Sequence, residues 1–274
     1  MASIKFCNIA DADSLISYLK ASQRLSNIKM VNKYLKLSSV IDMFSSRMWL
    51  INNPENMNDL YEYGAFPNRK IWEKVCYMSF VTQSTESMAM WSMYAQPWEN
   101  GVMISVPVSA LRNLIQNTKY LIAAEYDEST QRYAPTDNRI SAENVLSLNR
   151  VAYFDGVTLT CTGRDDRNAN FPEPYNISEL AGFIKDSAWE YEKEVRLRVD
   201  LPDEYECNVA YLELTDDFLS QIVIMTGPRF SCNVLTSLPQ KYRAKVKIES
   251  SKFQEKLAWI PCDSCSWKKS NKAD

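Results

Sequence analysis

The chain has 274 residues, of which 46% are hydrophobic and 12% aromatic, so it can bury a sizeable core in one large domain or two small ones. Its formal net charge of −3 excludes a protein that binds nucleic acid through an overall basic surface, while a local basic patch stays open. The sequence contains no histidine, which excludes Ser-His-Asp triads, Cys-His proteases and HExxH metalloproteases. Acid–base chemistry must therefore come from Glu, Asp, Lys, Tyr or Cys.

The first half of the chain is predicted to alternate helices and strands. The N-terminus lacks the apolar core of a signal peptide, and no apolar run is long enough to cross a membrane, so we expect a cytoplasmic protein. Apolar spacing and turn residues then predict the following elements. They are a helix at 11–26, an extended segment at 31–35, a helix at 38–44, a strand at 47–51, an irregular loop at 52–59, a helix at 68–75, a strand at 75–81, a helix at 88–94 and a strand at 102–106.

The second half is predicted to contain more strands. The expected elements are a helix at 109–117, a strand at 120–126, a polar stretch at 127–145 with a helix near 141–148, a hairpin of 150–154 and 157–162, a helix at 177–188, strands at 189–198, 208–214 and 221–225, a helix at 231–238 and an edge strand at 244–248. We therefore expect one α+β domain with a central, mostly antiparallel sheet flanked by helices. It would span residues 31–250, between an N-terminal helical extension (1–30) and a polar tail (251–274).

The stretch from Lys185 to Arg198 concentrates charge on one side of a predicted strand. Trp189, Tyr191, Val195 and Leu197 alternate with Glu190, Glu192, Glu194 and Arg196. Adjacent carboxylates on one strand face repel each other, so stability alone does not favour this arrangement, and glutamine replacements should leave the fold intact. A solvated strand face, with Arg196 and Lys193 as counter-charges, and a helix are the alternatives.

Metal and nucleotide motifs are sparse. Cys262-x-x-Cys265 is the only metal-like cysteine pair, and it supplies two of the four ligands that a structural zinc site needs, so no metal is expected. The chain has six glycines and contains neither GxGxxG nor a P-loop, which argues against a Rossmann or Walker-type nucleotide site.

Several short motifs together resemble a known family. In chain order they are Lys33-Tyr34, Met48 to Ile51, Asn53-Pro54, Asn58-Asp59, Met78 to Phe80, Met90 to Ala95, Gly101, Tyr153, the run from Lys185 to Arg196, and Gly227-Pro228. They resemble the bacterial family known as domain of unknown function 2971, over about residues 31–250. Two departures are visible: Leu60 follows Asp59 where the family has Pro-Phe, and Thr226 separates the Gly-Pro from its apolar strand.

The order of these motifs is also similar to the layout of ADP-ribosyltransferases, which use a first-strand His or Arg, a central Ser or Tyr and a late Glu. This likeness implies catalytic roles for three residues: Glu192, Glu194 and Tyr94. It implies NAD-binding roles for seven more: Lys33, Tyr34, Ser79, Trp91, Arg196, Asn58 and Asp59. Lys33 is a departure, since lysine cannot make the planar bidentate contact of arginine.

The likeness implies an NAD-dependent ADP-ribosyltransferase or NAD glycohydrolase, as a bacterial toxin or anti-phage effector, with NAD as substrate and a protein or nucleic acid as acceptor. Glu192 or Glu194 would stabilise the positive charge that develops on the ribose as the nicotinamide bond breaks. One alternative is a non-catalytic module that binds a partner through the acidic strand face. A nuclease whose glutamates hold Mg²⁺ fits less well, because such sites draw their acids from separate strands.

Overall fold

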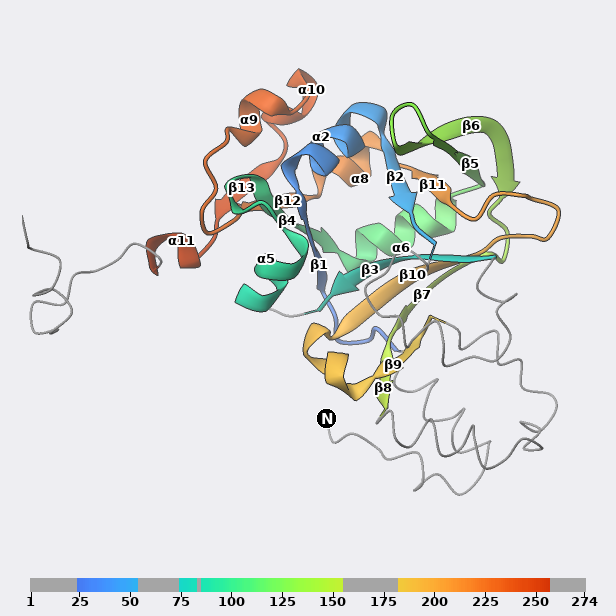
Figure 1. Cartoon of the computed structure of the whole chain (residues 1–274), viewed down its shortest axis with the longest axis horizontal. Helices are drawn as coiled ribbons and strands as arrows, with labels where there is room; N and C mark the ends of the chain where they lie inside the picture. The colour runs from blue at the N-terminus through green and yellow to red at the C-terminus, as the bar shows by residue number, and fades with distance from the viewer. Residues whose placement is uncertain (1–23, 54–73, 83–84, 155–181, 257–274) are drawn as a thin grey trace, which may run out of the picture.

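The computed structural model describes residues 24–53, 74–82, 85–154 and 182–256 (Figure 1). The strands are β1 (Met30–Lys36), β2 (Met48–Ile51), β3 (Val75–Val81), β4 (Gly101–Pro107), β5 (Tyr120–Asp127), β6 (Arg132–Ser141), β7 (Leu146–Arg150), β8 (Ala152–Phe154), β9 (Ile184–Asp186), β10 (Glu194–Asp200), β11 (Ala210–Glu213), β12 (Val223–Thr226) and β13 (Lys247–Ser250). The helices are α2 (Leu37–Ser46), α5 (Met88–Tyr94), α6 (Val108–Asn117), α8 (Asp216–Ser220), α9 (Val234–Ser237), α10 (Gln240–Arg243) and α11 (Phe253–Lys256), with 3₁₀ helices η3 (Trp98–Asn100) and η5 (Ser187–Glu192).

Within the described residues, seven strands form the larger sheet in the order β13-β12-β4-β1-β3-β10-β7. Its pairings are antiparallel except that of β12 with β13. A second sheet has the order β2-β11-β5-β6 and is antiparallel throughout. The prediction of an α+β fold with a large, mostly antiparallel sheet flanked by helices is confirmed.

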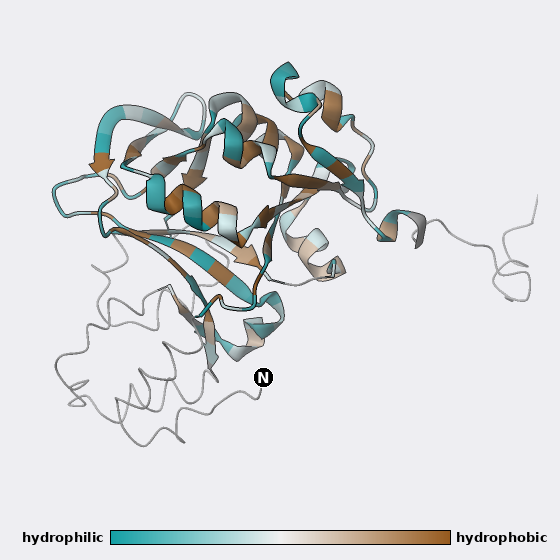
Figure 2. Ribbon diagram, turned by 180° about the vertical axis from the view of Figure 1, so that it is seen from behind, coloured by the Kyte–Doolittle hydropathy of each residue, from teal (hydrophilic) through white to brown (hydrophobic). Residues whose placement is uncertain are grey.

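The main hydrophobic core lies between the two sheets. Val195, Leu197 and Val199 of β10 contribute to it from the larger sheet, and Trp49 and Leu212 contribute from the smaller one. The core also takes in buried residues of α2 and α6. Figure 2 shows hydrophobic residues alternating with hydrophilic ones along strands of the sheet, and both kinds of residue on α6. Alternate residues of each strand in the larger sheet therefore point into this core.

The other face of the larger sheet carries two different environments. Tyr34, Met103 and Val81 form a second apolar cluster with Trp91 of α5. Beside it, β10 turns the intervening residues Glu194, Arg196 and Arg198 to the same face, and all three are buried. A strand that is buried on both faces thus places charged groups in the interior, where they require partners.

Several predicted elements match the structure closely, and others do not. The strand at 75–81 and the helix at 88–94 are confirmed, and the edge position of the last strand is correct. The helix near 141–148 is wrong, because residues 132–141 and 146–150 are strands. β6 is mostly exposed, so its polar composition hid its pairing with β5.

Around the acidic stretch, the strand prediction holds only from Glu194 onward. Residues 184–186 are a short strand that pairs in parallel with β8, and residues 187–192 are a 3₁₀ helix. The helix predicted at 177–188 is therefore wrong over its described part. The predicted helix at 11–26 and strand at 157–162 lie largely or wholly outside the described residues. The predicted polar tail at 251–274 contains the short helix α11 near its start.

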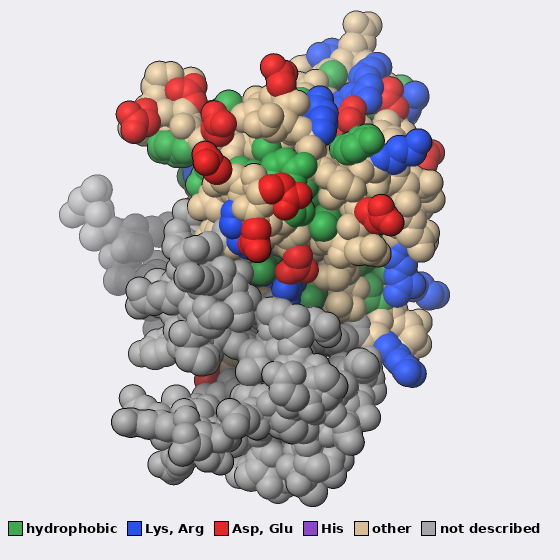
Figure 3. All heavy atoms as spheres, turned by 90° about the vertical axis from the view of Figure 1, so that its right-hand side faces the viewer, with side chains coloured by type: hydrophobic (Ala, Val, Ile, Leu, Met, Phe, Trp, Pro, Cys, Tyr) green, Lys and Arg blue, Asp and Glu red, His purple; other side chains and the backbone are tan. Residues whose placement is uncertain are grey.

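None of the helices in the described ranges has both the length and the apolar character needed to span a bilayer. Figure 3 shows both acidic and basic side chains on the described part of one face, with acidic ones more frequent on its left and centre and basic ones on its right. That mixture agrees with the small net charge of the sequence.

β1 and β3 diverge soon after they meet, and Lys33 lies at the point of divergence. The two strands share the registered pair Asn32 and Val81, after which β3 is bridged through Tyr77 to Asn52. The Lys33 ammonium donates a 2.9 Å hydrogen bond to the carbonyl oxygen of Ser79. The Lys33 side chain thus pairs with the Ser79 carbonyl oxygen. If β1 and β3 stayed paired along their length, a backbone amide of β1 would bond to that oxygen instead. Burial lowers the Lys33 pKa to about 8, and the negative charge of Glu194 opposes that shift.

We expect Lys33 to make the stability of the fold rise with pH. Its pKa is about 8 in the fold and 10.5 as the reference value, so between these values the unfolded chain binds more protons than the folded chain. The free energy of unfolding therefore increases across that window. Urea unfolding at several pH values should show this rise in the parent and a smaller rise in Lys33→Met. Lys36→Met, on the same strand and exposed, is the control. An equal rise in the parent and in Lys33→Met would contradict the assignment.

Candidate functional site

The charged cluster is built where η5 ends and β10 begins. The Asp186 side chain accepts a hydrogen bond from the Ala188 amide and caps η5. Lys193 then adopts a left-handed conformation with a φ of 48°, which turns the chain sharply into β10. As a result Glu192 and Glu194, on either side of this turn, are 1% and 6% exposed. A backbone turn, and not strand alternation alone, brings the two carboxylates together.

Glu192 is held by one hydroxyl and one ammonium. The Tyr94 hydroxyl of α5 donates to Glu192 Oε1 at 2.6 Å, and Lys185 Nζ of β9 donates to Oε2 at 2.6 Å. Lys185 is itself buried, and its ammonium lies 4.4 Å from the centre of the Trp189 ring. The carboxylate of η5 therefore meets a group from the adjacent strand β9 and a group from α5, which is distant in sequence.

Glu194 is held mainly by arginine. Arg196 Nη2 lies 2.7 Å from Glu194 Oε2, and Lys185 Nζ lies 3.7 Å from the same oxygen. The Arg196 guanidinium also donates to the Gly182 carbonyl oxygen at 2.7 Å and lies over the Tyr77 ring at 4.3 Å. The Tyr153 hydroxyl accepts a 2.8 Å hydrogen bond from the Glu194 amide. Lys185 thus lies near both carboxylates, whereas Arg196 forms an ion pair with Glu194.

The surroundings of the two carboxylates shift their pKa values in opposite directions. Burial and the neighbouring charge of Glu194 raise the pKa of Glu192, against the opposing effect of Lys185 and Tyr94. Burial alone would raise the pKa of Glu194 as well, but Arg196 and Lys185 outweigh it and lower the pKa below its usual value. Burial and the bond to Glu192 raise the pKa of Tyr94, so its hydroxyl stays protonated near neutral pH.

The structure brings together most of the residues named from the sequence. Tyr94 contacts Glu192, Arg196 contacts Glu194, and Lys185 links these two pairs. Lys33 interacts electrostatically with Glu194, and its bond to Ser79 goes to the backbone oxygen. The Ser79 hydroxyl contributes to the lowered pKa of Glu194, although its geometry is not that of a good hydrogen bond.

Other named residues lie apart from the cluster. Tyr34 packs edge-to-face against Trp91, with ring centres 4.8 Å apart, and its hydroxyl accepts a hydrogen bond from the Ser87 amide. Trp91 is 1% exposed and its indole nitrogen donates to Glu86, so it is a core residue in this conformation. Asn58 and Asp59 lie outside the described residues.

Sequence reasoning missed two members of the cluster, Lys185 and Tyr153. Both belong to the family motifs, yet neither was given a role. A useful signal was available for Lys185, because a run with three carboxylates needs more buried cations than Arg196 alone can supply. No local pattern indicated that the Tyr153 hydroxyl would meet the Glu194 amide.

The alternative of a solvated strand face is wrong for Glu192 and Glu194. Glu192 and Glu194 are buried and each pairs with a cation, so their partners determine their energies. Within the described ranges, no group of three or more Cys, Asp or Glu residues is placed to hold a metal ion. Cys262 and Cys265 lie outside those ranges.

Comparison with known proteins gives one match. A family model described as "Protein of unknown function (DUF2971)" matches residues 90–197, a span that contains Tyr94, Tyr153, Lys185 and both glutamates of the cluster. Searches of the curated proteins and of the solved structures find no significant match. The resemblance seen in the motifs is therefore confirmed over residues 90–197, which are similar to the DUF2971 family model.

Proposed function

We propose that this chain is a cytoplasmic enzyme that cleaves NAD at its nicotinamide bond and passes the ADP-ribosyl group to a macromolecular acceptor or to water, as a toxin or defence effector would. One observation carries the proposal. Two neighbouring buried carboxylates have pKa values displaced in opposite directions, and they meet a tyrosine and a lysine. Such divergence between paired acids is characteristic of acid–base sites.

The contacts suggest a division of labour between the two glutamates. Glu194 stays ionised because Arg196 lies against it, and it supplies a fixed negative charge. Glu192 binds protons more readily and is bonded to Tyr94, a half-buried residue. Glu192 is therefore the better candidate to stabilise a developing ribose cation or to take a proton from the acceptor. Tyr94 and Lys185 fix the orientation of its carboxylate.

We infer that a substrate reaches Glu192 between η5 and α5, because Tyr94 of α5 contacts the Glu192 carboxylate of η5. Beyond Tyr94 lie the exposed side chains of Met93 and Tyr191, and the Tyr191 hydroxyl approaches the Met93 sulfur at 3.6 Å. Because Glu192 is almost fully buried, a substrate needs these two elements to separate before it reaches the carboxylate. Opening of this kind is common where an active site must exclude water during the reaction.

Binding of a partner through an acidic strand face is less well supported. That hypothesis needs exposed carboxylates, whereas Glu192 and Glu194 are buried beside their own cations. A partner would have to compete with Lys185 and Arg196 in the interior, at a high desolvation cost.

We expect Glu192→Gln to lower NAD cleavage about 10²–10³-fold, because it removes one electrostatic contact with the transition state while keeping the side-chain shape. Tyr94→Phe, which removes only the hydroxyl that orients Glu192, should lower the rate by a smaller factor. The assay incubates the chain with labelled NAD and cell lysate and measures nicotinamide release and label transfer.

Glu190→Gln is the matched control, since Glu190 lies on η5 and outside the charged cluster; it should keep the parent rate. Thermal unfolding of each variant separates lost chemistry from lost structure. Parent-like activity in a folded Glu192→Gln would rule out the proposed role of that residue.

We also expect Glu194→Gln to destabilise the fold by roughly 3–5 kcal/mol, because it leaves the Arg196 guanidinium buried without its carboxylate. Adding Arg196→Met to that variant should recover part of the loss, since no unpaired charge then remains buried. Urea unfolding measures both changes, and Glu190→Gln should stay within about 0.5 kcal/mol of the parent. A single Glu194→Gln variant as stable as the parent would show that the ion pair is not structural.

A further inference from the structure

A groove of about 500 Å³ lies on the opposite side of the main core from the charged cluster. It is bounded by α6, by the turn into β5 and by the segment that joins β11 to α8. Leu114, Leu214 and Phe218, which line it, belong to the main core between the two sheets. Glu192 and Glu194 lie beyond the larger sheet, so the groove is separate from the proposed active site. Its volume lies in the range of small-molecule sites.

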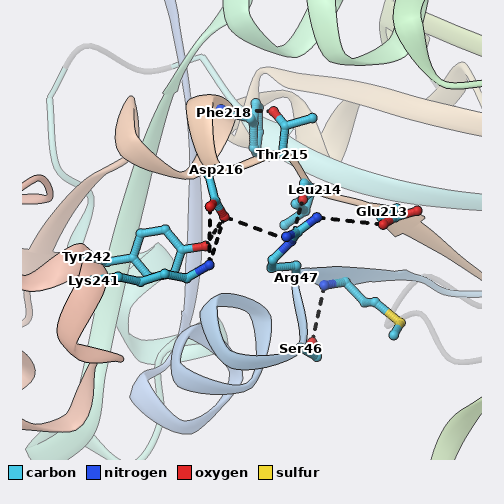
Figure 4. Close-up of polar contacts among 10 residues, drawn as sticks. Ser46, Arg47, Glu213, Leu214, Thr215, Asp216, Phe218, Lys241 and Tyr242 are labelled. Atoms are coloured by element: carbon cyan, nitrogen blue, oxygen red, sulfur yellow. Dashed lines mark hydrogen bonds and ion pairs between the residues drawn. The ribbon is translucent and has the colours of Figure 1, made fainter.

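Arg47 stands at one wall of the groove in an unusual backbone conformation. It has a φ of 59° at the end of α2, which costs energy for a residue with a Cβ. Its carbonyl oxygen accepts a 2.7 Å hydrogen bond from the Leu214 amide, and its Nε donates to the Leu214 oxygen at 3.4 Å (Figure 4). These contacts fix the position of the side chain at the groove.

The ion pairs of Arg47 are long. Its guanidinium lies 3.8 Å from Glu213 and 3.9 Å from Asp216, beyond the 2.7–2.9 Å of a strong charge-assisted hydrogen bond. Asp216 is engaged more closely by Lys241 Nζ at 3.0 Å and by the Tyr242 hydroxyl (Figure 4). Arg47 is therefore positioned by backbone contacts and keeps donor capacity for an anion in the groove.

Two further cations line the same groove from other elements. Lys119 comes from the turn before β5, and Arg139 comes from β6. The groove also contains the carboxylates of Glu213 and Asp217, so cations outnumber anions. The Asp217 carboxylate accepts a 2.9 Å hydrogen bond from the Gln221 amide. Convergence of three cations from three segments favours a phosphate group.

The remaining lining suits a planar ring that carries an amino group. The Tyr120 side chain, 57% exposed at the rim, offers a face for stacking. The Asn117 amide nitrogen donates to Asn113 at 2.8 Å, and the Gln221 amide nitrogen is used by Asp217. In both side chains the carbonyl oxygen is the group left to accept a hydrogen bond from a ligand donor.

From these contacts we propose that the groove binds a nucleoside phosphate whose base carries an exocyclic amino group, such as an adenine nucleotide. Arg47, Lys119 and Arg139 hold the phosphate, Tyr120 stacks on the base, and Asn117 and Gln221 accept from its amino group. The site is independent of the proposed NAD chemistry and would exist whether or not that proposal is correct.

The test is calorimetric titration of the full chain with adenosine monophosphate, inosine monophosphate and inorganic phosphate, each at low salt. We expect adenosine monophosphate to bind at least about tenfold more tightly than inosine monophosphate, which lacks the amino group. Arg139→Gln should weaken adenosine monophosphate at least about tenfold, through loss of a charge-assisted contact. Arg132→Gln should not, because Arg132 lies on the same strand outside the groove and pairs with Asp42.

Four results would overturn the proposal. The first is no binding of adenosine monophosphate at millimolar concentration. The second is equal weakening by Arg139→Gln and Arg132→Gln, which would indicate unspecific charge attraction. The third is equal affinity for all three ligands, which would remove the role of the base. Weakening by Tyr94→Phe but not by Arg139→Gln would place the nucleotide at the charged cluster, and that outcome too contradicts binding in the groove.

Discussion

The charged cluster depends on the buried ion pair between Arg196 and Glu194. The Arg196 guanidinium of β10 donates a hydrogen bond to the Gly182 carbonyl, which precedes β9, and it lies over the Tyr77 ring of β3. One side chain therefore connects three parts of the chain. Removing two charges from water is costly, and the pair persists because these further contacts satisfy the guanidinium. With Glu194 kept ionised in this way, the negative charge that raises the pKa of Glu192 is permanent.

The alternation of side chains along β10 places this ion pair and the hydrophobic core back to back. Val195, Leu197 and Val199 anchor the strand in the main core, while Glu194 and Arg196 occupy the opposite face. A rigid strand thus positions the charges, and η5 with α5 brings Glu192 and Tyr94 to them. Sites built on packed strands hold their geometry better than sites on loops, which suits the acid–base role that we propose for these residues.

The sequence was informative where a local pattern determined the structure. The strand at 75–81 is a continuous apolar run, and α5 follows Ser87, whose side chain caps it. β6 was missed because an exposed edge strand can be polar and still pair with its neighbour. η5 was missed because its end depends on Lys193 in a left-handed conformation, which lysine gives no reason to expect. Lys185 was overlooked although the run of carboxylates called for a further cation; only the fold shows that its partner is Glu192.

The surroundings of the two glutamates should give them different proton affinities. Carbon-13 NMR titration of the glutamate carboxyl groups measures this directly, with the signals of Glu192 and Glu194 assigned by single glutamine variants. We expect the Glu192 carboxyl to titrate with a pKa above that of an ordinary glutamate and the Glu194 carboxyl with a pKa below it. Two carboxyls that titrate together at the ordinary value, or Glu194 titrating above Glu192, would contradict this expectation.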